Sequence, residues 1–177
     1  MFVYIPVTIP AQTYSAQFKQ ELSIHGEAPK SIYNILGIDA SKNALKKAIK
    51  KFGETRIEKG HHFYESACYG NNNYIKFENI FGGSGYTISE SPEQVTPCKK
   101  IAKIPNRICN KLGICLGSSK EQVSKLIGKI FIDDDVTLRY SVNAVHKGVL
   151  FSLNTTIIFV FKYNVLIKMS VSLTETS

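Results

Sequence analysis

The spacing of apolar and polar positions in the C-terminal third of the chain predicts antiparallel strands. Between residues 165 and 174 every second position is apolar and most of those between are polar, as in a strand with one buried face. Residues 138–142 show the same alternation, whereas residues 157–161 are apolar throughout and predict a more deeply buried strand. Tyr163 and Asn164 supply the turn between the last two strands.

Three more strands are expected in the first half of the chain. Residues 62–69 and 74–81 are joined by Gly70-Asn-Asn-Asn73, whose composition favours a hairpin turn. A third strand is expected near residues 86–89, after Gly82-Gly-Ser-Gly85. That glycine-rich segment lacks the Gly-Lys-Ser/Thr ending of a phosphate-binding loop, so we interpret it as a flexible connection between strands.

A helical pattern precedes each set of strands. Over residues 44–52 apolar and basic residues fall on opposite faces of a helix, which Asp39 or Ser41 caps and Gly53 ends. Its basic face is formed by Lys42, Lys46, Lys47, Lys50 and Lys51.

The second helix is expected between Ser118 and Gly128. Ser118 and Glu121 have the spacing of a capping box, and Gly128 ends the pattern. The buried face is predicted to consist of Val123, Leu126 and Ile127. Both helices are short, so each needs a sheet to pack against.

A short segment occurs twice in the sequence. Ile32-Tyr-Asn-Ile-Leu-Gly-Ile38 and Ile108-Cys-Asn-Lys-Leu-Gly-Ile114 agree at Ile, Asn, Leu, Gly and Ile, and each precedes a Ser-Lys pair and a helical pattern. We therefore predict an α+β fold with two tandem repeats, each a helix plus a small antiparallel sheet. The predicted divisions are an N-terminal arm or residual signal segment (1–30), a first helix–sheet repeat (31–89), a basic linker (90–106) and a second helix–sheet repeat (107–177).

The sequence from Gly117 to Gly128, Gly-Ser-Ser-Lys-Glu-Gln-Val-Ser-Lys-Leu-Ile-Gly, is followed by alternating strands. It resembles the helix–sheet unit of the β-lactamase inhibitory protein family, and BamE-type envelope lipoproteins share a similar pattern. The resemblance covers residues 31–89 and 107–174 and implies a tandem helix–sheet fold that binds another protein through a sheet face. The hairpin at residues 70–73 carries no acidic residue, the chain has no Trp and no N-terminal lipidated Cys is present, which argues against β-lactamase inhibition and against a BamE-type anchor.

Tyrosines are the predicted contact residues of such a protein-binding face, because Tyr is enriched at interface centres. The candidates are Tyr64, Tyr69, Tyr74, Tyr86 and Tyr140. The alternative interpretation is that half or more of them only complete the hydrophobic core.

Four cysteines allow three disulfide pairings. They are Cys68, Cys98, Cys109 and Cys115, and no Cys-x-x-C pair of the kind found in zinc sites is present. Pairing Cys68 with Cys98 would close the first repeat, and pairing Cys109 with Cys115 would fix the segment before the second helix. Disulfides predict a periplasmic or secreted protein, whereas four free buried thiols would predict a cytoplasmic one.

Charge and histidine patterns give weak indications of chemistry. The net charge of +8 favours acidic partners, but the basic segments lack interleaved stacking aromatics, which argues against nucleic acid. Adjacent His61 and His62 would point to opposite faces of a strand and could not share a metal, and Asp133-Asp134-Asp135 lacks the spacing of a calcium loop. We predict no cofactor and no metal site.

We therefore predict a non-catalytic, exported protein that binds another protein. The alternatives are a structural or assembly protein of the cell envelope and an enzyme that uses Cys68 with His61 or His62. Residues 2–9 are apolar but interrupted by proline and preceded by no basic residue, so we interpret residues 1–16 as an arm or a truncated signal peptide. No apolar run is long enough to predict a membrane-spanning helix.

Overall fold

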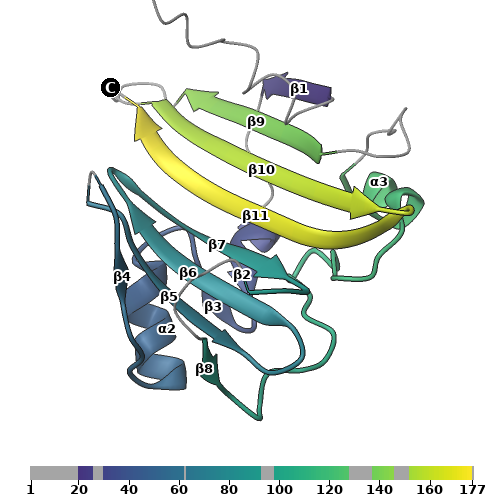
Figure 1. Cartoon of the computed structure of the whole chain (residues 1–177). Coiled ribbons are helices and arrows are strands. Elements are labelled where there is room, and N and C mark those ends of the chain that lie inside the picture. The colour runs from purple at the N-terminus through teal and green to yellow at the C-terminus, as the bar shows by residue number, and fades with distance from the viewer. Residues whose placement is uncertain are drawn as a thin grey trace, which may run out of the picture.

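The computed structural model of the chain describes residues 20–25, 30–61, 63–92, 98–127, 137–145 and 152–176 (Figure 1). Within these residues the chain is α+β, with two α-helices, one 3-10 turn and a sheet that is largely antiparallel. The elements are β1 (Gln20–His25), η1 (Lys30–Tyr33), β2 (Asn34–Ile35), β3 (Ile38–Asp39), α2 (Ala44–Phe52), β4 (Glu58–Lys59), β5 (Glu65–Gly70), β6 (Tyr74–Ile80), β7 (Gly83–Ser89), β8 (Lys99–Lys100), α3 (Lys120–Ile127), β9 (Thr137–Val145), β10 (Ser152–Lys162) and β11 (Val165–Thr176).

One sheet runs through the described part of the molecule, in the order β1-β9-β10-β11-β7-β6-β5-β4. The seven strands from β9 to β4 pair antiparallel, while β1 joins the β9 edge and β8 joins β5 in parallel. The predicted strands at 138–142, 157–161, 165–174 and 74–81 are confirmed. The turn between β10 and β11 is confirmed as well, with positive φ at Tyr163 and Asn164.

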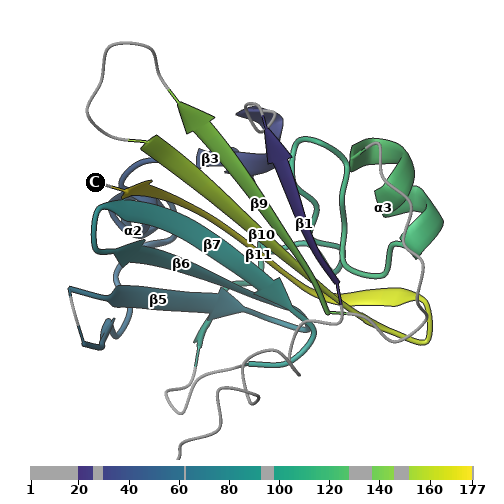
Figure 2. The ribbon, with the colours of Figure 1, turned by 90° about the horizontal axis from the view of Figure 1, so that it is seen from above.

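The prediction of two separate small sheets is wrong. β7 pairs with β11 along its whole length, from Ser89 opposite Lys168 to Gly83 opposite Thr174, and so joins the strands of the two halves. This pairing satisfies main-chain groups that two separate sheets would each have left exposed at an edge. In Figures 1 and 2 the β9–β11 half and the β4–β7 half are seen as parts of one strongly twisted sheet.

A tandem repeat is not evident among the described residues either. α2 packs on β5, β6 and β7, whereas α3 lies beside the turn between β10 and β11 (Figure 2). The two matching sequence segments do lie side by side: Ile35 forms a bridge with Asn110, and the Lys111 amide donates to the Asn34 carbonyl at 2.7 Å. The two segments therefore pair with each other, and they do not begin two equivalent units.

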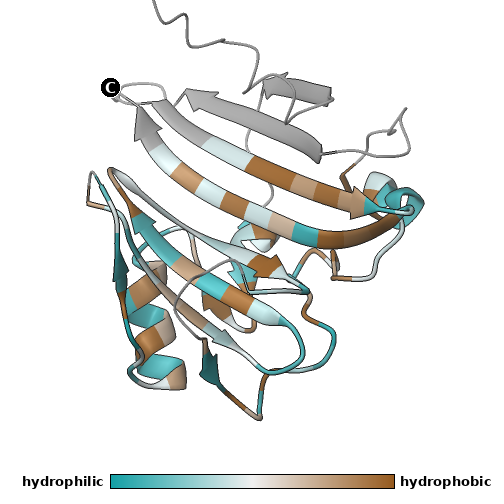
Figure 3. Ribbon diagram, viewed as in Figure 1, coloured by the Kyte–Doolittle hydropathy of each residue, from teal (hydrophilic) through white to brown (hydrophobic). Residues whose placement is uncertain are grey.

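The hydrophobic core lies between the sheet and the elements α2, η1, β2 and β3. Side chains alternate along β11, where Figure 3 shows hydrophobic and polar positions in turn, whereas residues 157–161 of β10 are hydrophobic throughout. The largest side chains that are fully buried there are Tyr69, Tyr86, Phe77, Phe159, Ile32, Ile35, Ile75, Ile88, Ile108, Ile114 and Leu166. α2 contributes Ala44, Leu45 and Ala48, which confirms its predicted amphipathic orientation.

The predicted cap of α2 by Asp39 or Ser41 is wrong. The residue before the helix is Asn43, in the left-handed region with φ 53°, and its side chain makes no capping bond. The Ala44 amide instead donates to Ser84 Oγ at 2.8 Å, a partner on β7. Asp39 accepts bonds from the Ser41 amide and hydroxyl, which lower the pKa of this carboxyl although partial burial opposes them. Gly53 ends the helix, as predicted, and its φ of 82° favours glycine, but its ψ of 169° lies outside the left-handed helical region that was expected.

The capping box of α3 is shifted by one residue from its predicted position. The Gln122 amide donates to Ser119 Oγ at 3.3 Å and the Ser119 amide donates to Gln122 Oε1 at 3.0 Å. Leu126, predicted to be buried, is 40% exposed, whereas Val123 and Lys120 are the buried residues of α3 and Lys120 Nζ lies over the Phe161 ring of β10. Gly128 lies outside the described residues.

Two disulfides link the four cysteines, Cys68 with Cys98 and Cys109 with Cys115. The first ties β5 to the segment before β8, and the second closes a short loop before α3. These two pairings are among those that the sequence allowed, and the disulfides indicate an oxidising, extracytoplasmic compartment. In the part of the chain that the structure describes, no helix is long and apolar enough to cross a membrane.

Candidate protein-binding face

One face of the sheet carries α2, β2 and β3, and the other is turned toward the viewer in Figure 1. We call the second the open face, because no helix among the described residues packs on it. Its side chains come from the alternate positions of β6, β7, β11 and β10. They are Tyr74, Lys76, Glu78, Thr87, Ser89, Lys168, Ser170, Ser172, Thr156, Ile158 and Val160.

Charged and aromatic side chains on the open face hold one another in place. The Tyr64 hydroxyl donates to Glu78 Oε2 at 3.2 Å, and Lys76 Nζ lies 3.6 Å from the same oxygen. Lys76 Nζ also lies 5.8 Å from the centroid of the Tyr64 ring, within cation–π range. The side chains of Lys76 and Glu78 are only 19% and 13% exposed. These groups are therefore ordered before any partner arrives, which lowers the entropic cost of an interface.

Small residues line the open face where β7 meets β11. A Cβ added at Gly83 would collide with the Leu173 carbonyl oxygen, and one added at Gly85 would collide with that of Val171. Thr87 Oγ1 and Ser170 Oγ lie 2.8 Å apart across the same junction. The two halves of the sheet thus approach closely on this side, and glycine is what permits the approach.

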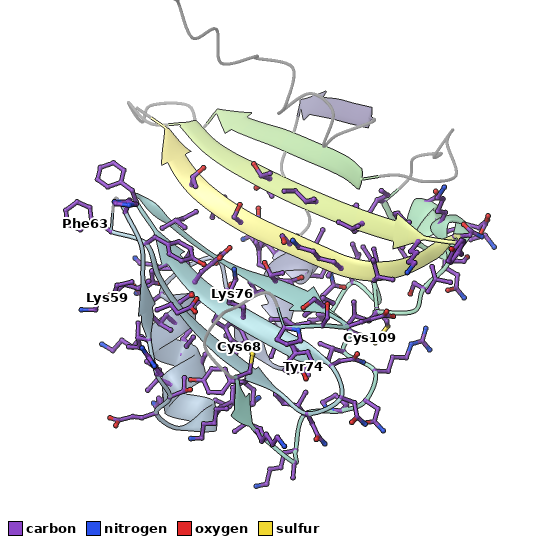
Figure 4. The ribbon with its side chains drawn as sticks, in the orientation of Figure 1. Lys59, Phe63, Cys68, Tyr74, Lys76 and Cys109 are labelled. Carbon is purple, nitrogen blue, oxygen red and sulfur yellow. A yellow bond between two sulfur atoms is a disulfide. The ribbon has the colours of Figure 1, made fainter. Side chains whose placement is uncertain are left out.

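Two exposed phenylalanines lie at one end of the sheet. Phe63, in the loop before β5, is 81% exposed, and Phe81, in the turn after β6, is 73% exposed. Their ring centroids are 6.1 Å apart, and Figure 4 shows Phe63 pointing away from the body of the molecule. We call them the phenylalanine pair. Phe63 has φ 62°, a left-handed conformation that is unfavourable for a bulky side chain.

Beside the phenylalanine pair the surface is hollowed. The hollow has a volume of about 400 Å³ and is lined by Arg56, Ile57, Glu58, Lys59, Gly60 and Tyr64. Ile57 is 37% exposed, so the lining of the hollow combines an apolar side chain with charged neighbours. Tyr64 borders both the hollow and the Lys76–Glu78 cluster, which makes the hollow continuous with the open face.

The structure separates the five tyrosines predicted for the interface. Tyr64 and Tyr74 are half-buried on the open face. Tyr69 and Tyr86 are 0% exposed on the opposite side, so as core residues they cannot contact a partner. The β9 residue Tyr140 has its side chain outside the described part of the chain.

The hydroxyls of the two buried tyrosines point inward. Tyr69 donates to the Gly53 carbonyl at 3.1 Å, and Tyr86 donates to the Ile32 carbonyl at 2.6 Å. Burial raises the pKa of Tyr69 to about 12 and that of Tyr86 still further, so both stay neutral.

Sequence reasoning missed the phenylalanine pair. Phe63 was placed inside a strand predicted from residue 62, but β5 begins at Glu65, so Phe63 belongs to a loop. Phe81 closes a predicted strand and directly precedes Gly82-Gly83. A large aromatic next to a glycine turn is a usable signal, since turn residues face solvent.

The other chemical candidates lose support. The Cys68 sulfur is bonded to Cys98, so it offers no thiolate for a nucleophilic reaction with His61. His61 is exposed, and His62 lies outside the described residues, as does Asp133-Asp134-Asp135. No group of three or more metal-ligating side chains occurs within the described ranges.

Comparison with known proteins assigns no family to this chain. No protein-family model matches it, and neither a curated protein nor a solved structure does. The resemblance to the β-lactamase inhibitory protein family therefore stays a prediction from sequence, and the open face must be interpreted from its own residues.

Proposed function

We propose that this is a non-catalytic, periplasmic or secreted protein that binds another protein through the open face and the phenylalanine pair. The observation that carries the proposal is the exposure of Phe63 and Phe81 beside each other at the end of an uncovered sheet face. Exposed aromatic clusters of this kind are typical of interaction sites, since they expose apolar surface to water with no gain for the isolated fold.

The backbone at Phe63 supports the same proposal. A left-handed conformation at a bulky residue costs about 1–3 kcal/mol, and the exposed Phe63 ring lies beside that of Phe81. Local strain that holds a side chain in solvent is more easily explained by a contact with a partner than by stability.

The resemblance to the β-lactamase inhibitory protein family supports this proposal through the arrangement of helix and sheet. A helix-backed sheet that binds with its uncovered face matches what the resemblance implies, and a tandem origin of the two halves is part of the same hypothesis. The acidic hairpin of the family has no counterpart here. Asn72 Nδ2 donates a hydrogen bond to Asn106 Oδ1 at 2.9 Å, and Asn73 Nδ2 donates one to the Asn106 carbonyl. This hairpin is neutral and tethered, so we do not propose β-lactamase as the target.

The test compares partner capture by three forms of the oxidised protein: the wild type, a Phe63→Asn/Phe81→Asn variant and a Tyr163→Asn control. Asn tolerates the left-handed backbone at position 63, and Tyr163 is an equally exposed aromatic at the far end of β10. We expect the wild type and the control to capture the same protein from the host's extracytoplasmic fraction.

With that protein purified, the phenylalanine variant should bind at least about 100-fold more weakly, because a central interface aromatic contributes about 1.5–2 kcal/mol. Lys76→Ala should also weaken binding, because it removes the group that orders Tyr64 and Glu78. Equal affinity of all the variants would overturn the proposed interface.

A further inference from the structure

The outward side of α2 is a surface of concentrated positive charge. Its lysines are Lys46, Lys47, Lys50 and Lys51, with Lys42 just before the helix, and α2 contains no acidic residue. Lys42, Lys46 and Lys50 follow at four-residue spacing, so they line one side of the helix and repel one another. In the described ranges, the ion pair made by this helix joins Lys47 to Asp39 at 3.6 Å.

The positive surface continues past the end of α2 onto β8. Lys99 Nζ donates to the carbonyls of Phe52 and Glu54 at 3.1 and 2.9 Å, which holds β8 against the helix end. The next basic residues, Lys100 and Lys103, are exposed. We define the lysine face as Lys42, Lys46, Lys50, Lys51, Lys100 and Lys103, of which Lys51 also donates from Nζ to the Leu36 carbonyl.

The composition of the lysine face indicates which kind of anion it suits. All six residues are lysines, whose ammonium groups are point charges that lack the fork with which Arg recognises individual carboxylates or phosphates. Among the described residues no exposed aromatic is interleaved with them, as single-stranded nucleic acid would require. The apolar side of α2 is already buried against the sheet, so the helix cannot insert into a hydrocarbon layer. What remains is attraction to a flat, diffuse negative surface.

We infer that the lysine face binds peripherally to the headgroups of an anionic lipid bilayer. Polybasic surfaces bind such membranes in proportion to the number of lysines that approach them. An extracytoplasmic location, which the disulfides indicate, keeps the protein away from most nucleic acid.

The position of α2 determines how a molecule bound to a membrane by its lysine face would be oriented. α2 lies behind the sheet when the open face is viewed, as Figures 1 and 2 show together. A molecule held by its lysine face therefore directs the open face away from the bilayer. This consequence rests on the proposed function, whereas membrane binding itself does not.

The test measures sedimentation of the full-length oxidised protein with vesicles of phosphatidylcholine alone or of phosphatidylcholine with phosphatidylglycerol. The variant is Lys42→Gln/Lys46→Gln/Lys50→Gln, and Gln keeps the helix propensity. The matched control is Lys59→Gln/Lys125→Gln/Lys162→Gln, which removes the same charge from exposed lysines elsewhere.

We expect the wild type and the control to bind the anionic vesicles and not the neutral ones. The helix variant should bind about 100-fold more weakly, at about fivefold for each lysine removed. Three outcomes would overturn the inference: no binding of the wild type at low salt, an equal loss in the control, or tighter binding to nucleic acid than to vesicles.

The proposals of partner binding and of membrane binding can be tested independently of each other. The helix variant should keep full affinity for the protein partner, and the Phe63→Asn/Phe81→Asn variant should keep full affinity for vesicles. Loss of vesicle binding in the phenylalanine variant would contradict the lysine face as the membrane contact while leaving the partner measurement intact.

Discussion

At the scale of single residues, Tyr86 connects more of the fold than any local sequence pattern suggests. Its hydroxyl donates to the Ile32 carbonyl at 2.6 Å and lies 3.4 Å from Asn110 Nδ2. Asn110 in turn accepts from the Ile114 amide at 3.0 Å and is almost fully buried. One phenol thus joins β7 to both copies of the matching segment.

Replacing Tyr86 with Phe should destabilise the protein by about 1–3 kcal/mol, because the Ile32 carbonyl would stay buried without its donor. Urea unfolding monitored by circular dichroism measures the change. Tyr74→Phe, on the half-buried open face, serves as the control and should change stability by less than about 0.5 kcal/mol. Equal stability of the two variants would mean that a water replaces the lost hydroxyl.

The two roles of tyrosine show where sequence reasoning ends at this scale. The side chains of Tyr64 and Tyr74 lie on the open face of the sheet, whereas those of Tyr69 and Tyr86 lie on the opposite, core-facing side. The alternation of residues along a strand predicts which side chains face the core only when one set of alternate positions is clearly polar. β5 and β7 carry small residues such as Ser, Ala and Gly on both faces, so their sequences leave the phase open.

At the scale of elements, amphipathic patterns predicted α2 and the long strands well, and local caps poorly. α2 repeats its apolar positions at helical spacing, and this pattern survives in any tertiary context. Its cap comes from Ser84, which is distant in sequence and brought near only by the folded sheet. No local pattern could have indicated that bond.

The prediction at the scale of elements concerns the substitution of Gly85. Gly85→Ala should destabilise the protein by about 2–3 kcal/mol, because the new Cβ would press on the main chain of β11 and force β7 and β11 apart. Gly117→Ala is the matched control: it has positive φ but open space around it, so only backbone strain of about 1 kcal/mol is expected.

Thermal unfolding ranks the two glycine variants. A melting temperature lowered more by Gly117→Ala than by Gly85→Ala would contradict the close approach of the two halves. The open face should also lose partner affinity in Gly85→Ala, since the junction shapes its centre.

At the scale of the whole molecule, the α+β fold class was predictable, the disulfide pairing was one of three that the sequence allowed, and the union of the two halves was not predictable. Alternating strands and short helices specify α+β because their periods differ. The β7–β11 junction depends on Gly83 and Gly85 meeting the main chain of a distant strand. Nothing in the spacing of either strand identifies its partner.

The two disulfides should differ in their contribution to stability. Cys68 and Cys98 are 30 residues apart in sequence, against 6 for Cys109 and Cys115, so the first bridge removes more entropy from the unfolded chain. Cys68→Ala/Cys98→Ala should lower the free energy of unfolding by about 3–4 kcal/mol, and Cys109→Ala/Cys115→Ala by about 2 kcal/mol. Denaturant unfolding under non-reducing conditions measures both, and the reverse order would show that native-state packing outweighs loop closure.

The parallel pairing of β1 with β9 sets an order of events for folding. Gln20 lies opposite Leu138 and His25 opposite Asn143, so the first strand of the chain must wait for one made near its end. Closing so long a loop is entropically slow, whereas the β10–β11 hairpin and the β5–β6–β7 meander close over short turns. Until β1 arrives, β9 presents an unpaired edge to any other extended chain. Once β1 has docked, the outer edge at this end of the described sheet is a strand of six residues. The edge offered to neighbouring chains is therefore longest, at the nine residues of β9, between synthesis of β9 and docking of β1.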